Sequence, residues 1–172
     1  MTIFLIGYMG SGKSTIGNQL SKVLKFDFVD LDAYIEEKEG MSISELFQSK
    51  GEIYFRKIEN RYLEDIVRLE YTVVSLGGGT PCYGNNMKMI TATTNVKSIY
   101  LKSSIPTLIE RLKQEKYNRP MISHLKTEEE LTEFIGKHLF ERTQFYNQSD
   151  LTLVIDKKSI NEIVGELVMQ LF

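Results

Sequence analysis

The sequence has 172 residues, of which 42% are hydrophobic and 26% charged, so it suits one globular domain with one buried core and is short for two. Its formal net charge of -2 argues against a broad basic surface for nucleic acid, and no apolar run is long enough to span a bilayer, so neither partner is expected. The one cysteine, Cys82, cannot form an internal disulfide, which favours a reducing, cytoplasmic environment and a space-filling free thiol.

Short apolar runs alternate with segments of helical periodicity along the chain. The first run, residues 2–6, is followed by a Gly-rich stretch and then by apolar residues at helical spacing up to residue 24, which predicts strand, loop and helix. Further β-rich runs occupy residues 27–29, 71–76, 96–101 and 151–155. Five strands that alternate with helices predict an α/β fold with a parallel sheet covered on both faces.

Several helix starts carry a capping box, in which a Ser or Thr hydroxyl and a Glu three residues later satisfy free backbone N–H groups. These boxes predict helices over residues 43–50, 128–146 and 160–171. The pairs are Ser42 with Glu45, Thr127 with Glu130, and Ser159 with Glu162.

Residues 113–126 lie between two helical segments and show no clean periodicity. The stretch is polar and contains Pro120. This composition predicts a mobile surface lid, and a plain loop is equally consistent with it.

Residues 7–14, GYMGSGKS, fit the pattern G-x-x-x-x-G-K-[ST] between a predicted strand and a predicted helix. Glycines at 7, 10 and 12 let backbone N–H groups turn toward phosphate oxygens, and the helix dipole adds positive potential. Lys13 is therefore expected at the β- and γ-phosphates, and the Ser14 hydroxyl at Mg²⁺. An ordinary Gly-rich turn is disfavoured because the full motif stands in this context. The motif alone does not separate kinases from GTPases, ATPases or sensors.

Asp30 and Asp32 fall just past the second predicted strand, where an open α/β sheet gathers its ligands. In an extended segment, residues two apart face the same side. One carboxylate can then serve a metal ion and its waters while the other takes or orients the proton of an attacking hydroxyl. Alternatively, the two residues cap and charge the start of a helix that continues through Ala33.

Arg56 and Glu59 are three residues apart, so on a helix the carboxylate can brace the guanidinium. Such a pair is either a surface ion pair or a fixed fork for a substrate carboxylate, and the spacing alone favours the surface pair. Gly77, Gly78 and Gly79 follow the third predicted strand. A triple glycine there favours close approach of the backbone to a ligand over a need for positive φ angles.

Ser75 stands on the third predicted strand, where most proteins with this phosphate loop carry an Asp for the magnesium shell. Asp30 is expected to supply the missing carboxylate. Arg119, in the proposed lid, and Arg142 are either exposed arginines or functional charges. In the second case Arg119 would neutralise charge during phosphoryl transfer, and Arg142 would complete a carboxylate clamp.

In their order and spacing, GYMGSGKS, FVDLD, FRKIE, SLGGG, NRP and ERTQFY resemble the shikimate kinase family from Thr2 to the final helix. The resemblance implies one P-loop kinase domain over residues 1–172, with a five-stranded parallel sheet in the order 2-3-1-4-5 flanked by helices. It also implies a substrate-binding helical segment at about 33–60 and a lid at about 113–126. The implied protein is a cytoplasmic monomer that uses Mg²⁺ and ATP to phosphorylate the 3-hydroxyl of shikimate in aromatic amino-acid biosynthesis.

The resemblance also implies roles for individual residues. Asp32 is the candidate base, assisted by Lys13 and the lid residue Arg119. Ser14 would bind Mg²⁺ directly, and Asp30 and Ser75 through water. The shikimate-binding residues are Asp32, Arg56, Gly77, Gly78, Gly79 and Arg142. The nucleotide-binding residues are Gly10, Ser11, Gly12, Lys13, Ser14, Thr15, Arg111 and Arg119, with the loop at 156–158 beside the adenine.

Other functions compete with this one. Another small-molecule kinase, for example one for gluconate, would use the same cradle and an arginine clamp. The combination of Asp32, Arg56 and the triple glycine favours shikimate. A nucleotide-binding sensor without catalysis should lack at least one catalytic residue. This sequence has all four candidates, namely Lys13, Ser14, Asp32 and Arg119. A GTPase needs a guanine-reading Asn-Lys-x-Asp segment, which the sequence lacks.

Overall fold

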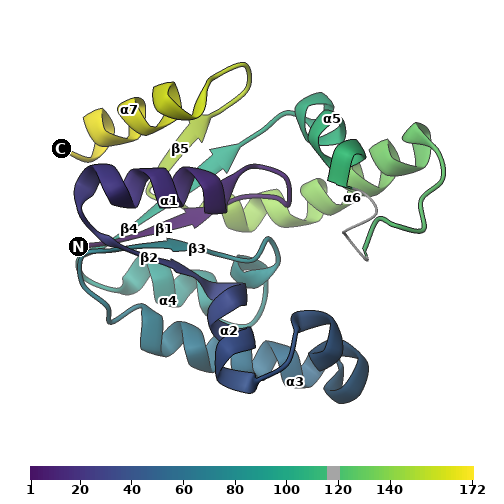
Figure 1. Cartoon of the computed structure of the whole chain (residues 1–172), viewed down its shortest axis with the longest axis horizontal. Helices are drawn as coiled ribbons and strands as arrows, with labels where there is room; N and C mark the ends of the chain where they lie inside the picture. The colour runs from purple at the N-terminus through teal and green to yellow at the C-terminus, as the bar shows by residue number, and fades with distance from the viewer. Residues whose placement is uncertain (116–120) are drawn as a thin grey trace.

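A five-stranded parallel sheet in the order β2-β3-β1-β4-β5, as predicted, forms the centre of the protein (Figure 1). The computed structural model describes residues 1–115 and 121–172. Leu5 pairs with both Ser75 and Ile99, so the loops that follow the three central strands leave the sheet at one edge. The strands are β1 Thr2–Ile6, β2 Asp27–Asp30, β3 Thr72–Ser75, β4 Val96–Lys102 and β5 Leu151–Val154.

Helices cover both faces of the sheet, as the alternating pattern predicts. In Figure 1, α1 and α7 lie on one side of the sheet, and α3 and α4 lie on the other. None of the helices in the described ranges combines the length and apolar character that crossing a membrane requires. The helices are α1 Lys13–Leu24, α2 Leu31–Glu39, α3 Ile43–Ile66, α4 Asn86–Ala92, α5 Ile105–Glu115, α6 Glu128–Tyr146 and α7 Ile160–Leu171, with a short 3-10 turn η1 Thr80–Cys82.

Strand β1 is buried on both faces and divides the core into two parts. Phe4 and Ile6 pack with buried residues of α3, α4, α5 and α6. Ile3 and Leu5 pack with buried residues of α1 and α7. The loop after β1 is therefore anchored from both sides of the sheet.

The three predicted capping boxes are all present, and α6 and α7 have the predicted bounds. The predicted helix 43–50 is present too, as the first part of α3, and a second part continues to Ile66. Gly51, at φ 82° and ψ 168°, interrupts the helical backbone between its two halves. The predicted helix 43–50 is the first half, and the second half carries Arg56.

The region predicted as a lid is described only at its ends. Residues 113–115 belong to α5, and residues 121–124 form turns before α6. Ile122 is fully buried in the larger part of the core, so this end of the segment is anchored. Arg119 and Pro120 lie outside the described residues. The lid and the function of Arg119 stay predictions.

Candidate active site

The phosphate-binding loop joins β1 to α1. Gly10 and Gly12 have φ angles of 80° and 85°, a region that favours glycine. Lys13, only 8% exposed, donates hydrogen bonds from Nζ to the carbonyl oxygens of Gly7 and Tyr8, both at 2.9 Å. The lysine thus curls back over its own loop and holds its positive charge inside it.

Three oxygen-bearing side chains meet beside the loop, each from a different element. Ser14 Oγ donates to Asp30 Oδ2 at 2.6 Å and lies 3.2 Å from Ser75 Oγ. These hard oxygens suit Mg²⁺, which usually keeps several waters and takes only one or two protein ligands next to substrate phosphates. Among the described residues, no group of three or more His, Cys, Asp or Glu side chains could hold a metal ion. The oxygens of Ser14, Asp30 and Ser75 suit an ion that substrate phosphates also bind.

Asp30 combines the two roles that the sequence left open. Its Oδ1 accepts from the backbone N–H groups of Asp32 and Ala33, which makes it the N-cap of α2, while its Oδ2 faces Ser14. Because Asp30 caps the helix, Asp32 lies in the first turn of α2 and not in an extended segment. Both carboxylates nevertheless line the same cavity.

Asp32 lies in an environment that disfavours its charge. Burial, followed by the neighbouring carboxylates of Asp30 and Glu59, raises its pKa to about 6, although Lys13 acts in the opposite direction. A carboxyl group with this pKa is mostly ionised at neutral pH and still binds a proton readily. These are the properties of a general base.

Each glycine of the turn after β3 faces a different charged side chain. A Cβ atom on Gly77 would lie 3.0 Å from Asp32 Oδ1, and one on Gly78 would lie 3.3 Å from Arg142 Nη1. A Cβ atom on Gly79 would lie 3.0 Å from Arg56 Nη2. None of these three glycines has a positive φ angle. The turn needs glycine because charged groups converge on it, and not because of its backbone conformation.

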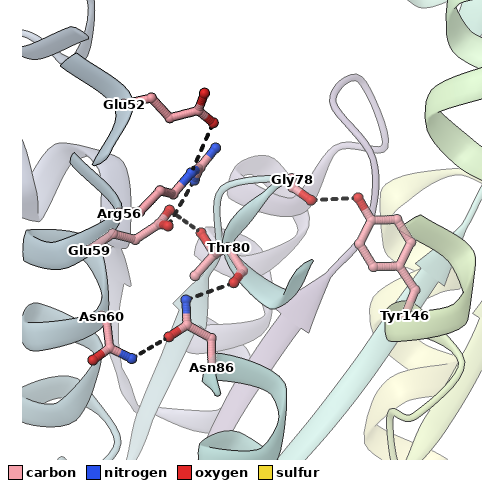
Figure 2. A network of polar contacts seen from close by, with 8 residues as sticks. All are labelled: Glu52, Arg56, Glu59, Asn60, Gly78, Thr80, Asn86 and Tyr146. Carbon is pink, nitrogen blue, oxygen red and sulfur yellow. Dashed lines mark hydrogen bonds and ion pairs between the residues drawn. The ribbon is translucent and has the colours of Figure 1, made fainter. Parts of the chain in front are cut away.

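Arg56 is not the surface ion pair that its spacing alone favours (Figure 2). Its Nη1 donates to Glu59 Oε2 at 2.8 Å, and Glu59 is only 1% exposed. Glu59 Oε1 accepts a second bond, from Thr80 Oγ1 at 2.7 Å. The Arg56 guanidinium carbon lies 3.7 Å from the centre of the Tyr83 ring. Burial lowers the pKa of Arg56, but the Glu59 charge and hydrogen bond, together with Tyr83 and Glu52, raise it, and the net shift is upward.

Helix α6 brings Arg142 to the opposite side of the glycine turn. Tyr146 Oη donates to the carbonyl oxygen of Gly78 at 2.6 Å, which ties the helix to the turn (Figure 2). Tyr8, from the phosphate loop, lies with its hydroxyl 3.1 Å from His138 Nδ1 and its ring centre 5.6 Å from the Arg142 guanidinium carbon. Arg142 is therefore held between two contacts that join α6 to the rest of the site. Sequence reasoning did not single out either tyrosine, because only the fold brings these residues together.

A cavity of about 530 Å³ connects the phosphate loop to the glycine turn. Of the predicted site residues that the structure describes, Arg56, Gly79 and Arg142 are not part of its lining, and Ser11 is fully buried. Arg111 lines the cavity and donates to the carbonyl oxygen of Gly10 at 3.1 Å. The other predicted residues that line it are Gly10, Gly12, Lys13, Ser14, Thr15, Asp30, Asp32, Ser75, Gly77 and Gly78.

The cavity also has lining residues that were not predicted. Gln114 and Glu115, from the last turn of α5, lie on one part of its wall, and Ile160 and Ile163 of α7 on another. Lys158, in the predicted adenine loop, lines it as well. Unlike Lys158, whose loop the family resemblance had placed beside the adenine, the residues of α5 and α7 carry no motif, and only the packing of these helices beside the phosphate loop reveals them.

Comparison with known proteins identifies the family. The family model described as "Shikimate kinase" matches residues 9–172. The chain is 46% identical over 167 residues to the shikimate kinase of Flavobacterium johnsoniae, an alignment that covers 96% of each protein. The crystal structure of the Bacteroides thetaiotaomicron shikimate kinase matches with a TM-score of 0.91 at 36% identity, over 99% of this chain and 98% of that one.

A second solved structure is that of the Acinetobacter baumannii shikimate kinase in complex with shikimate. It matches with a TM-score of 0.87 at 26% identity, over 99% of this chain and 92% of that chain. The family match and the sequence identity extend over nearly the whole length and agree with the fold and with the residues around the cavity. The chain belongs to the shikimate kinase family.

Proposed function

We propose that this chain transfers the γ-phosphate of ATP to the 3-hydroxyl of shikimate, giving shikimate 3-phosphate and ADP in the shikimate pathway. The observation that carries this proposal is the convergence of Asp32, Arg56 and Arg142 on one glycine turn, next to a phosphate-binding loop. Shikimate has both a carboxylate for two arginines and a hydroxyl for a base. The Acinetobacter baumannii relative was solved in complex with shikimate, which further supports this acceptor.

At the nucleotide end, Lys13 exchanges part of its bonding to the loop carbonyls for bonds to the β- and γ-phosphates. Gly10, Ser11, Gly12 and Thr15 contribute the surrounding loop and helix start, and Arg111 flanks the adenine. Mg²⁺, held by Ser14 directly and by Asp30 and Ser75 through water, would neutralise phosphate charge when bound. Arg119 is proposed to add a positive charge from the lid.

At the acceptor end, Arg56 and Arg142 bind the shikimate carboxylate, and Gly77, Gly78 and Gly79 leave room for the ring. Asp32 takes or orients the proton of the 3-hydroxyl as the new O–P bond forms and the bond between the γ-phosphorus and the bridging oxygen of ADP breaks. The raised pKa of Asp32, about 6, suits this exchange near neutral pH. Most of the proposed substrate-binding segment, residues 33–60, consists of α2 and α3, and it contains Arg56.

We also propose that the protein acts as a cytoplasmic monomer. Residues of this one chain supply the phosphate loop, the candidate base and both arginines, so catalysis does not need a second copy. Cys82 is a half-buried free thiol, which is compatible with a reducing compartment.

The carboxylate clamp is tested by Arg56→Ala and Arg142→Ala. Truncating one partner of a desolvated ion pair typically costs about 2–5 kcal/mol, so each variant should raise the shikimate KM by tens- to thousands-fold. The ATP KM should barely change. Arg56→Lys should restore little, because an ammonium keeps the charge and loses the planar fork.

A modified substrate makes the test specific. Reducing the shikimate carboxylate to an alcohol should impair the wild-type enzyme far more than it impairs either alanine variant, because those variants have already lost a carboxylate contact. Steady-state kinetics with both acceptors measures this difference. If the variants discriminate against the alcohol as strongly as the wild type does, the two arginines do not read the carboxylate.

A further inference from the structure

Thr80 follows the glycine turn directly and is fully buried. We propose that Thr80 is a positioning residue for acid recognition, whose hydroxyl fixes the Glu59 carboxylate and, through it, the direction of the Arg56 guanidinium. This inference rests on the proposed function, because it requires Arg56 to read the acid. It adds a determinant of acid binding that does not itself touch the substrate.

The two oxygens of Glu59 have separate partners. Thr80 Oγ1 donates to Oε1 at 2.7 Å, and Arg56 Nη1 donates to Oε2 at 2.8 Å (Figure 2). Glu59 is only 1% exposed, so water has little access to replace either donor. The Thr80 hydroxyl thus keeps the Glu59 carboxylate from turning about its bond to the side chain. The fixed carboxylate in turn holds the direction of the Arg56 guanidinium.

Thr80 is itself held from the opposite side. Its carbonyl oxygen accepts from Asn86 Nδ2 at 2.8 Å, and Asn86 Oδ1 accepts from Asn60 Nδ2 at 2.6 Å (Figure 2). Asn60 is the chain neighbour of Glu59 on α3, so the hydrogen bonds and the helix backbone close a ring. A closed ring of satisfied polar groups allows little independent movement of any member.

Arg56 has little room to adapt if this ring opens. A Cβ atom on Gly79 would lie 3.0 Å from Arg56 Nη2, so the guanidinium already lies against the backbone of the turn. The guanidinium carbon also lies 3.7 Å from the Tyr83 ring centre. Because two-pronged binding of a carboxylate tolerates displacements of only about 0.5 Å, a small rotation of Glu59 is enough to weaken acid binding.

The experiment compares Thr80→Val, Thr80→Ala and Thr80→Ser. Valine keeps the shape and alanine avoids any clash, and both leave Glu59 Oε1 without its donor. Both should raise the shikimate KM by roughly 5- to 100-fold, the range for an orphaned buried acceptor, and change the ATP KM by less than about twofold. Thr80→Ser keeps the hydroxyl and should stay within about twofold of wild type.

Thr72→Val is the matched control. Thr72 is 2% exposed, and its hydroxyl donates to the Glu70 carbonyl oxygen at 2.9 Å, away from Glu59. This variant removes a buried threonine hydroxyl from the same region of the chain and should lower thermal stability without changing the shikimate KM. A KM increase in Thr72→Val equal to that in Thr80→Val would overturn the inference.

Combination with Arg56→Ala separates this inference from the proposed function. If Thr80 acts through Arg56, then adding Thr80→Val to Arg56→Ala should leave the shikimate KM unchanged. An unchanged KM in Arg56→Ala alone contradicts the proposed clamp itself. Two results would overturn only the role of Thr80, provided that Arg56→Ala raises the shikimate KM. In the first, Thr80→Val leaves the shikimate KM unchanged. In the second, Thr80→Ser raises the shikimate KM as much as Thr80→Val does.

Discussion

Lys13 supplies the positive charge of the phosphate loop, and Lys13→Met tests that role. The backbone of the loop is positioned by β1 and α1, so the fold should persist while turnover falls by at least about two orders of magnitude, as expected for the loss of a preorganised charge. Turnover and the melting temperature are measured together. Lys22→Met, an exposed position on the same helix, serves as the control. Wild-type turnover in Lys13→Met would argue against contact with the phosphates.

Asp32 connects activity to stability through its raised pKa. In the folded protein the pKa is about 6, above the ordinary value of about 4 for an unfolded chain, so the folded state binds this proton more tightly. The ionised carboxylate therefore lowers the free energy of unfolding above about pH 6. This penalty shrinks as the pH falls through about 6 and is absent below about 4.

Asp32→Asn should accordingly be more stable than wild type at about pH 7.5, and the difference should vanish below about pH 4. Turnover should fall at the same time, because the candidate base is gone. Urea unfolding over a range of pH, without nucleotide or magnesium, measures the stability difference, and Asp27→Asn is an exposed control. A variant that is no more stable than wild type at neutral pH would show that the buried charge is not destabilising.

At the scale of elements, residues 113–126 are predicted to close over the bound substrates. Amide hydrogen exchange in this segment should slow when ADP and shikimate are both added, and exchange in α4 should not change. The buried Ile122 should give its own end of the segment the stronger protection in the free enzyme. If amide exchange in this segment is equal in the free and the doubly liganded protein, the segment does not close over the substrates. Arg119 would then be an ordinary exposed arginine.

Helix starts could be predicted because their determinants are local. A capping box needs only residues three apart, and each predicted box is present. The second part of α3 could not be predicted in this way, because it follows the break at Gly51 without a capping box. The ring contact between Phe47 and Phe55 joins the two parts of the helix. For Asp30 and Asp32 the sequence offered two interpretations, and the helix start is confirmed, with Asp30 as the cap and Asp32 in the first turn, whereas the extended segment is wrong.

At the scale of the whole molecule, the sequence predicts those parts of the site whose residues lie close together in one short motif. The phosphate loop and the pair formed by Asp30 and Asp32 belong to this class. The bonds from Tyr146 to Gly78 and from Tyr8 to His138 join residues far apart in the chain, and no spacing rule connects them. The strand order could be predicted only from the family resemblance. Periodicity predicts how many strands there are, but it does not predict which strands lie next to each other.

The central position of β1 has a consequence for synthesis on the ribosome. Thr2 pairs with Thr72 on one side and with Val96 on the other, so β1 is synthesised well before both of the strands that it pairs with. Until β4 has left the exit tunnel, the nascent chain carries the whole phosphate-loop sequence without one of the two strands that flank β1. We therefore expect that nucleotide assists folding only after β4 has emerged, and that a chain stalled or truncated before β4 binds no ATP.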